Sequence, residues 1–310
     1  MICLNCQYNN LESAVFCQSC GNKLPDHEGI SARATPQAQP FRASAVSVEG
    51  NVVQLARRAL GDLIGQTISI YKLHFLVFFA LAVIPQIPVV ILTMLVPELG
   101  SGFTADNEGE TFDFPQLGEL AGTVFVLVVA TIVLSLLSIG GIIYATGQHY
   151  LGRNVEFLAV LGAAASKFVA LLLVAILLVL IFLIPAALTL ILIGLPVLIF
   201  AMVRLYFAFD ALVLEDLRPV DSIRRSWRLV EGHWWRTFGI GIIFFLMVFG
   251  ATFVGSLLLL PLDSLGGTAL SSIVSGLISA IVAPFMHIGA TLVYLDLRVR
   301  QEGGSVKIVG

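Results

Sequence analysis

Charged residues are scarce in this 310-residue chain: Asp, Glu, Lys and Arg make up 12% of it, against 58% hydrophobic residues. Soluble domains carry about 25% charged residues, so the composition argues against a soluble globular protein. The sequence also lacks a His-Glu-x-x-His motif, a Gly-x-Ser-x-Gly motif and a Walker phosphate-binding loop. Because no motif of these enzyme classes is present, we predict that the protein is not an enzyme.

Cysteine is confined to the first 20 residues, where Cys3/Cys6 and Cys17/Cys20 form two Cys-x-x-Cys pairs. Two such turns can supply four thiolates to one tetrahedral Zn²⁺ ion. A segment this short needs a metal or disulfides to fold. Disulfides require an oxidising compartment, and the polar residues at the start of the chain do not resemble a secretory signal peptide. The sequence therefore favours a structural Zn²⁺ ion held by Cys3, Cys6, Cys17 and Cys20 over two disulfides or a redox role.

Residues 1–24, with both cysteine pairs and Gly21 after the second, resemble the short zinc-ribbon domain that heads many prokaryotic membrane proteins. The resemblance implies a two-knuckle structural site. Only Glu12 and Lys23 are charged in this segment, so the basic surface that nucleic-acid binding needs is missing. We therefore expect no nucleic-acid partner, and we expect the ribbon to dock a cytosolic protein. Residues 25–50, rich in Ala, Ser, Gln and Pro, are predicted to form a flexible linker.

Long uncharged runs predict that residues 51–303 form a transmembrane domain, followed by a tail at 304–310. Residues 168–203 contain no charge, and a helix of that length would measure about 54 Å, too long for one crossing of a ~30 Å core. We therefore predict a turn at Pro185. Helices satisfy the backbone polar groups in lipid, so the fold class is an all-α polytopic membrane protein with a small N-terminal zinc ribbon. The six predicted spans are 73–97, 120–147, 168–184, 188–209, 237–262 and 270–295.

Lysine and arginine are absent from the three loops that connect the two spans of each predicted hairpin, at 98–119, 184–189 and 263–269. All 17 basic residues therefore fall on the other side of the membrane. By the positive-inside rule, this asymmetry predicts a multi-pass protein of the cell (plasma or inner) membrane with both termini in the cytoplasm.

A short cytoplasmic segment precedes each predicted hairpin, at Leu60–Lys72, Val155–Lys167 and Val220–Arg236. In the third segment an apolar stripe recurs at helical spacing, and three arginines flank it. Such a helix is expected to lie in the headgroup plane with its arginines toward anionic lipid headgroups, or to act as a plain topology anchor. The stripe consists of Val220, Ile223, Trp227, Val230 and Trp234, and the arginines are Arg224, Arg225 and Arg228.

The Arg-Ser-Trp sequence at 225–227, the segment 232–236 and the Asp-Leu-Arg sequence at 296–298 resemble the membrane domain associated with glycerophosphoryl diester phosphodiesterases. The resemblance covers about residues 55–303 and implies a six-helix fold, which also occurs in stand-alone proteins of that family. Catalysis in the enzymes belongs to a separate soluble barrel. No segment outside the predicted spans is long enough for such a barrel, so we do not expect hydrolase activity.

Ionisable residues near the ends of predicted spans four and six are candidate functional groups, because intramembrane charge is costly. We predict that Arg204 forms an ion-pair clamp with Asp210 or Asp296, and that His287 is a packed, hydrogen-bonded residue. The sequence favours a non-enzymatic membrane component whose ribbon docks a partner. A small transporter or channel would require a cavity lined by two or more charges. A lipid-related intramembrane enzyme would require a polar cluster at one depth.

Overall fold

The computed structural model describes residues 48–49, 51–95, 114–189 and 194–309. The predicted zinc ribbon at 1–24, with its four cysteines, lies outside the described residues, as does nearly all of the predicted linker. The described residues belong to one compact unit, Ser44–Gly310.

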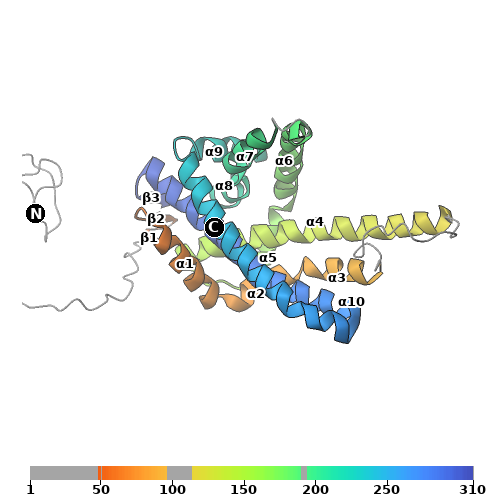
Figure 1. The fold of residues 1–310 in the computed structure, drawn as a ribbon. Coiled ribbons are helices and arrows are strands. Elements are labelled where there is room, and N and C mark those ends of the chain that lie inside the picture. Colours follow the sequence, from red (N-terminus) through yellow and green to blue (C-terminus); the bar gives the residue numbers. More distant parts are fainter. Residues whose placement is uncertain (1–47, 50, 96–113, 190–193, 310) are drawn as a thin grey trace, which may run out of the picture. The chain divides into compact units, whose positions relative to one another are not determined.

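Six stretches of the described chain are long and apolar enough to cross a membrane, which confirms the predicted number of spans. The chain is therefore a multi-pass membrane protein built from helices (Figure 1). The stretches are Phe75–Met94, Ala121–Tyr150, Phe168–Leu188, Gly194–Glu215, Trp234–Leu257 and Leu270–Glu302. The helices that form them are α2 (Phe75–Val83), α3 (Gln86–Leu95), α4 (Phe114–Tyr150), α6 (Phe168–Leu188), α7 (Gly194–Leu205), α8 (Ala208–Glu215) and α10 (Trp234–Glu302).

The predicted turn at Pro185 is wrong, because α6 continues through this residue to Leu188. A proline in the last turn of a helix removes a single backbone hydrogen bond. The loss is tolerated better near the end of a helix than in its middle. The third and fourth stretches are separated instead between Leu188 at the end of α6 and Gly194 at the start of α7. The fourth stretch contains a further helix break, between Leu205 at the end of α7 and Ala208 at the start of α8.

Three short helices occupy the segments predicted to precede the hairpins: α1 (Leu60–Leu73), α5 (Phe157–Ser166) and α9 (Pro219–Leu229). In α1 the buried residues Leu63, Thr67 and Ile70 follow one face of the helix. The third helix is shorter than predicted. It ends at Leu229 before Gly232, whose φ of 77° suits glycine, and α10 then begins at Trp234.

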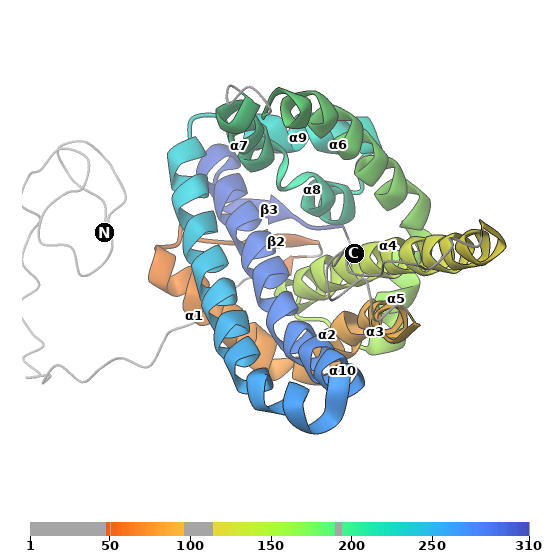
Figure 2. The same ribbon diagram turned by 45° about the vertical axis from the view of Figure 1, so that its right-hand side comes forward.

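The two spans of α10 run back beside one another (Figure 2), and small residues allow them to approach closely. A Cβ atom at Gly289 would overlap the Phe244 ring, and one at Gly255 would lie 2.8 Å from Ile278. Each pair joins the first span of α10 to the second, which establishes their antiparallel packing.

The second half of α4 is the centre of the buried core, and its glycines carry the contacts. Gly140 and Gly141 face Ala164 and Val160 of α5, while a Cβ at Gly147 would lie 2.7 Å from Leu214 of α8. Substitution of these glycines would therefore separate helices that now touch.

A small antiparallel sheet is the main departure from the predicted all-helical body. Strands β1 (Val48–Glu49), β2 (Val52–Gln54) and β3 (Ser305–Lys307) pair in the order β1-β2-β3, with Val53 opposite Val306. Strand residues therefore occur at the end of the predicted linker at 25–50 and within the predicted tail at 304–310. Figure 1 shows the sheet at the C-terminal end of α10, beside α1.

Candidate functional site

The sheet ties the segment that follows the predicted linker to the end of the membrane domain. The Leu55 N–H donates to the Gly304 carbonyl at 2.7 Å, and the Ile308 N–H donates to the Asn51 carbonyl at 2.9 Å. The Val309 N–H reaches the Leu214 carbonyl of α8 at 2.8 Å. These bonds fix residues 51–55 to the C-terminal segment, which is itself bonded to α8.

Asp296 is the centre of an ion-pair cluster at this junction. Its side chain is fully buried, and it accepts from Arg236 Nη2 at 3.0 Å and from Arg300 Nε at 2.8 Å. The Arg58 backbone N–H donates to its other carboxylate oxygen at 2.8 Å. Arg236 and Arg300 also donate to the Arg58 carbonyl, at 2.9 and 3.0 Å. The cluster, which we call the Asp296 cluster, therefore joins residue 58 to both ends of α10.

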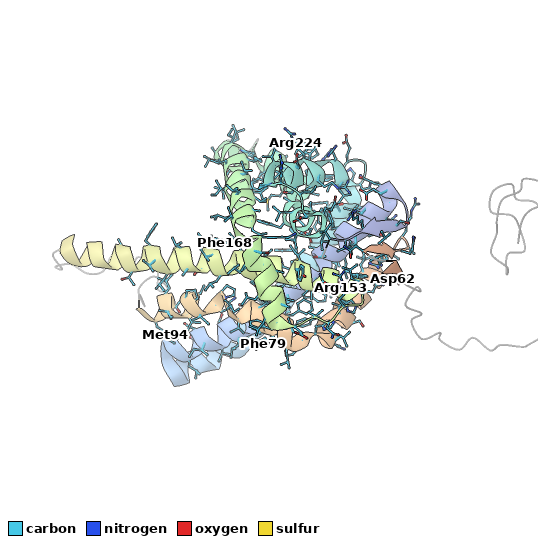
Figure 3. All side chains as sticks on the ribbon, turned by 180° about the vertical axis from the view of Figure 1, so that it is seen from behind. Asp62, Phe79, Met94, Arg153, Phe168 and Arg224 are labelled. Atoms are coloured by element: carbon cyan, nitrogen blue, oxygen red, sulfur yellow. The ribbon has the colours of Figure 1, made fainter. Side chains whose placement is uncertain are left out.

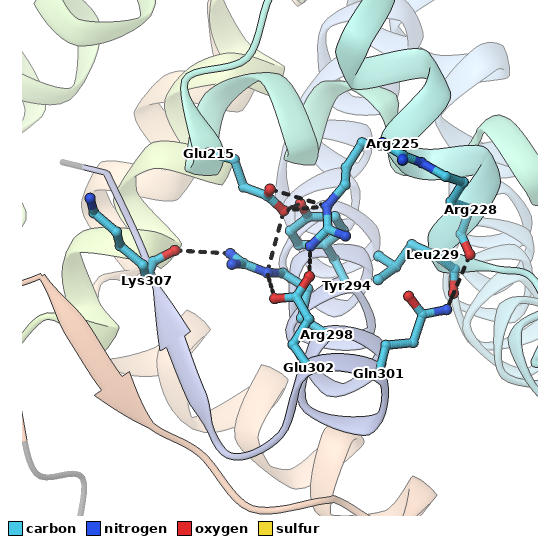
Figure 4. A network of polar contacts seen from close by, with 9 residues as sticks. All are labelled: Glu215, Arg225, Arg228, Leu229, Tyr294, Arg298, Gln301, Glu302 and Lys307. Atoms are coloured by element: carbon cyan, nitrogen blue, oxygen red, sulfur yellow. Dashed lines mark hydrogen bonds and ion pairs between the residues drawn. The ribbon is translucent and has the colours of Figure 1, made fainter.

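A second network lies beside it and joins α8, α9, α10 and β3 (Figure 4). Glu215 accepts hydrogen bonds from Arg225 Nε at 3.0 Å and from the Tyr294 hydroxyl, and it forms an ion pair with Arg298 Nε at 3.3 Å. Glu302 pairs with both arginines, and Arg298 Nη1 donates to the carbonyl of the last β3 residue at 2.9 Å. Two carboxylates and two guanidinium groups thus neutralise each other, and this allows these charges to be partly buried.

The arginines of α9 divide into two groups. Arg225 points inward to Glu215, so it is not available to lipid headgroups as predicted. Arg224 and Arg228 are exposed, and Figure 3 shows Arg224 at the outer edge of the body. The apolar stripe is divided as well, because Trp227 is 40% exposed whereas Val230 is fully buried. Contact of Arg224 and Arg228 with anionic headgroups stays a prediction.

The predicted clamp between Arg204 and an aspartate is wrong. Arg204 Nη1 donates to the Trp227 carbonyl at 3.0 Å, and its guanidinium group lies over the Trp227 and Phe200 rings at 4.9 and 5.2 Å. Asp296 is occupied by arginines of α10, which lie closer to it. Arg204 therefore fastens α7 to α9 through aromatic faces rather than through a carboxylate.

Ser226 of α9 satisfies the backbone at the break between α7 and α8. Its Oγ accepts from the Phe207 N–H at 3.2 Å and donates to the Arg204 carbonyl at 2.8 Å. Interrupted helices need such partners, because unpaired backbone groups are costly away from water. Sequence reasoning missed this role, since Ser226 lies within the predicted apolar segment as an unremarkable polar residue.

Two cavities lie along the break. One, of about 240 Å³, is lined mainly by apolar side chains and by Tyr206, Asp210 and His287. The other, of about 250 Å³, has an almost entirely apolar lining and shares Met202, Tyr206 and Ala290 with the first. His287 is thus placed in a cavity wall. No hydrogen bond to its ring occurs among the described residues, so the predicted hydrogen bond is not found there.

A histidine pair joins the start of the first span to the end of α4. His74 Nε2 lies 3.2 Å from His149 Nδ1, so one ring can donate a hydrogen bond to the other while at least one is neutral. Burial lowers the pKa of His74 below its ordinary value of 6.5. The sequence offered no signal for this pair, because the two residues are 75 positions apart.

Within the part of the chain that the structure describes, no three His, Cys, Asp or Glu side chains are grouped to hold a metal ion. The predicted zinc site therefore depends on the spacing of Cys3, Cys6, Cys17 and Cys20, which lie outside the described residues. The candidate site of the described body therefore has two parts. One is the junction, where residues 51–58 are attached to the C-terminal segment and to the Asp296 cluster. The other is the pair of cavities beside the helix break.

Residues 116–297 match a family described as a domain of unknown function, DUF7847. The match covers more than half of the chain, so the chain belongs to this family. Comparisons with curated proteins and with solved structures give no match. The matched range runs from α4 to the Asp296 cluster, and it leaves out the cysteine segment. The resemblances to the zinc ribbon and to the phosphodiesterase-associated membrane domain stay predictions.

Proposed function

We propose that this DUF7847 protein is a non-enzymatic membrane anchor that holds its N-terminal cysteine segment at the cytoplasmic face of the cell membrane. In this proposal, Cys3, Cys6, Cys17 and Cys20 bind one structural Zn²⁺ ion, and the folded segment docks a cytosolic protein. The six-span body keeps that partner at the membrane.

The junction at residues 51–58 is the observation that carries the proposal. This segment directly follows the N-terminal region, and it is held by strand pairing to β3 and by the Asp296 cluster. A freely trailing N-terminus would need no such attachment. Because residues 51–58 are fixed, the tethered cysteine segment explores a limited volume. Its effective concentration near the membrane surface is therefore raised.

Zinc binding is tested on the full-length protein purified in a neutral detergent. Metal analysis should find one Zn²⁺ per chain in the parent and in Ser19→Ala, which alters a residue between two ligands without removing a thiolate. Cys17→Ser should lose the ion, because three thiolates leave a tetrahedral site incomplete. A parent protein without stoichiometric zinc would refute the metal site.

Docking is tested by crosslinking in native membranes, with Ser19→Ala as the matched control. We expect a cytosolic protein to be captured by the parent and by Ser19→Ala, and to be lost in Cys17→Ser. Equal thermal stability of the membrane body in all three proteins would exclude general unfolding. Capture that is the same in Cys17→Ser would mean that the cysteine segment does not dock the partner.

The proposed orientation is tested with single cysteines in a variant that lacks the native thiols. A cysteine at position 107 should react with an impermeant reagent in intact cells. A cysteine at position 224, an exposed site on α9, should react only after the cells are opened. The reverse pattern would place the junction outside the cell and end the anchor proposal.

The cavities favour a second candidate function, the binding of an amphiphilic molecule. Among the described residues that line them, Asp210 is the single carboxylate, accompanied by His287. This supports a binding site better than a conduction path with several charges.

A further inference from the structure

Asp210 is a buried carboxylate that the anchor proposal does not use. It is 3% exposed, and the Thr291 hydroxyl donates a hydrogen bond to its Oδ1 at 2.8 Å. Within the described ranges, no Lys, Arg or His forms an ion pair with it. Asp296, the other carboxylate buried in the described body, has two arginines. An ionised carboxylate buried without a cation is costly, so Asp210 is either protonated or offset by a positive charge that a ligand supplies.

The surroundings of Asp210 show where such a counter-charge would enter. Asp210 lines the cavity of about 240 Å³, whose walls come from α4, α6, α7, α8 and α10. Tyr206 and His287 line the same space and can supply further hydrogen bonds, while the remaining walls are apolar. A few polar groups in an otherwise apolar cavity are the usual pattern of a small-molecule site.

The neighbouring cavity determines the shape of the molecule that would fit. It has a volume of about 250 Å³, is lined almost wholly by aliphatic and aromatic side chains, and adjoins the first cavity at Met202, Tyr206 and Ala290. A ligand with a polar end at Asp210 could therefore place a hydrocarbon chain in the second cavity. The two cavities match an amphiphile better than a fully polar solute.

We propose that the paired cavities bind an amphiphilic amine, with its ammonium group at Asp210 and its alkyl chain in the apolar cavity. An ammonium group would be a positively charged partner for Asp210, and it donates charge-assisted hydrogen bonds to the carboxylate. A metal ion would need further ligands, and no group of three His, Cys, Asp or Glu residues occurs in the described chain. The break between α7 and α8 forms part of the cavity wall, as interrupted helices do in other membrane binding sites.

The test uses the full-length protein in a neutral maltoside detergent, with dodecylamine and 1-dodecanol as probes and native mass spectrometry as the readout. The parent should bind dodecylamine about tenfold or more tightly than dodecanol, as a charge-assisted hydrogen bond in a buried site predicts. Asp210→Asn keeps the acceptor for Thr291 and the side-chain shape, and it should bind the two probes equally. Equal binding of both probes by the parent would show a protonated Asp210 and overturn the proposal.

Two controls locate the site. Asp221→Asn removes an exposed carboxylate of α9 and should bind dodecylamine as the parent does. Ala290→Met fills the place where the cavities meet and should weaken both probes; parent-like binding in this variant would overturn the location. Thermal midpoints without probe confirm that each variant is folded. If Asp210→Asn unfolds, the preference of the folded parent for amine over alcohol and the Ala290→Met result still decide the proposal.

Competition identifies the source of the amine. Phosphatidylethanolamine carries a primary ammonium group, whereas phosphatidylcholine carries a trimethylated one without N–H donors. Displacement of dodecylamine by phosphatidylethanolamine alone supports a membrane lipid as the ligand, and displacement by neither lipid supports a free amphiphilic amine. Equal displacement by both lipids would show that the ammonium N–H groups are not recognised, contrary to the proposal.

Discussion

Replacement of Asp296 by Asn is the sharpest perturbation of the junction. The substitution keeps the shape of the side chain and an acceptor for the Arg58 N–H, but it removes the negative charge that Arg236 and Arg300 share. Two guanidinium groups would then face each other without a carboxylate between them. We expect the free energy of unfolding to fall and the attachment of residues 51–58 to loosen.

The size of the loss follows from the burial of the three groups. Removal of one partner from a buried ion pair costs about 3–5 kcal/mol. The Asp296 side chain is fully buried, whereas the Arg236 and Arg300 side chains are 31% and 20% exposed. Because water can solvate the exposed parts of the two arginines, we expect a loss near the lower end, about 3 kcal/mol.

The loss is measured by unfolding the full-length protein in mixed micelles with increasing denaturing detergent. Asp221→Asn is the matched control, because it removes an exposed carboxylate of α9 and should change stability by less than about 0.5 kcal/mol. Hydrogen exchange should also become faster at the amides of residues 51–55 in Asp296→Asn. A variant as stable as Asp221→Asn, with unchanged exchange, would refute the role assigned to the Asp296 cluster.

Three further predictions concern packing, the helix break and pH. Gly289→Ala should lower stability by about 1–3 kcal/mol because the new methyl group meets the Phe244 ring, whereas Gly239→Ala, with open space around it, should not; equal effects would refute the close packing. Ser226→Ala should cost about 1–3 kcal/mol in the same unfolding assay, since it leaves a backbone N–H at the break without its partner, and a neutral result would contradict that role. Because the pKa of His74 is lowered in the folded protein, the unfolded chain binds more protons near and below pH 6.5, so thermal stability should fall as the pH drops through this value. His74→Gln should reduce that slope, and an unchanged slope would assign it to other groups.

The spans and the short helices could be predicted because their signals are local. An uncharged run long enough to cross a bilayer has few other interpretations, and the apolar stripe at helical spacing from Val220 predicted the helix α9. The apolar stripe predicted a helix as far as Trp234, because Val230 and Trp234 continue the helical spacing, whereas α9 ends at Leu229, shortly before Gly232. Periodicity reports which residues are apolar, and the backbone at one glycine decides where the helix stops.

The candidate site could not be predicted in the same way, because its contacts depend on faces that the sequence does not reveal. Arg204, Arg236 and Arg300 are equally plausible partners for Asp296 in sequence, and only the packing of α10 selects two of them. The same packing leaves Asp210 beside Thr291, with no ion-pair partner among the described residues. The three strands were not predicted, because each has only two or three residues, too few to show an alternating pattern of apolar and polar residues.

The pairing of β2 with β3 has a consequence for the order in which the molecule assembles. Gln54 and Ser305 are hydrogen-bonded although 251 positions separate them. During translation, β2 leaves the ribosome before any of the six spans, and it must wait for β3 until the last span has been synthesised. Closure of the sheet is therefore a late, non-local step, which marks completion of the membrane domain. Chains that stop before residue 305 would leave the edge of β2 that pairs with β3 open, and open strand edges promote aggregation.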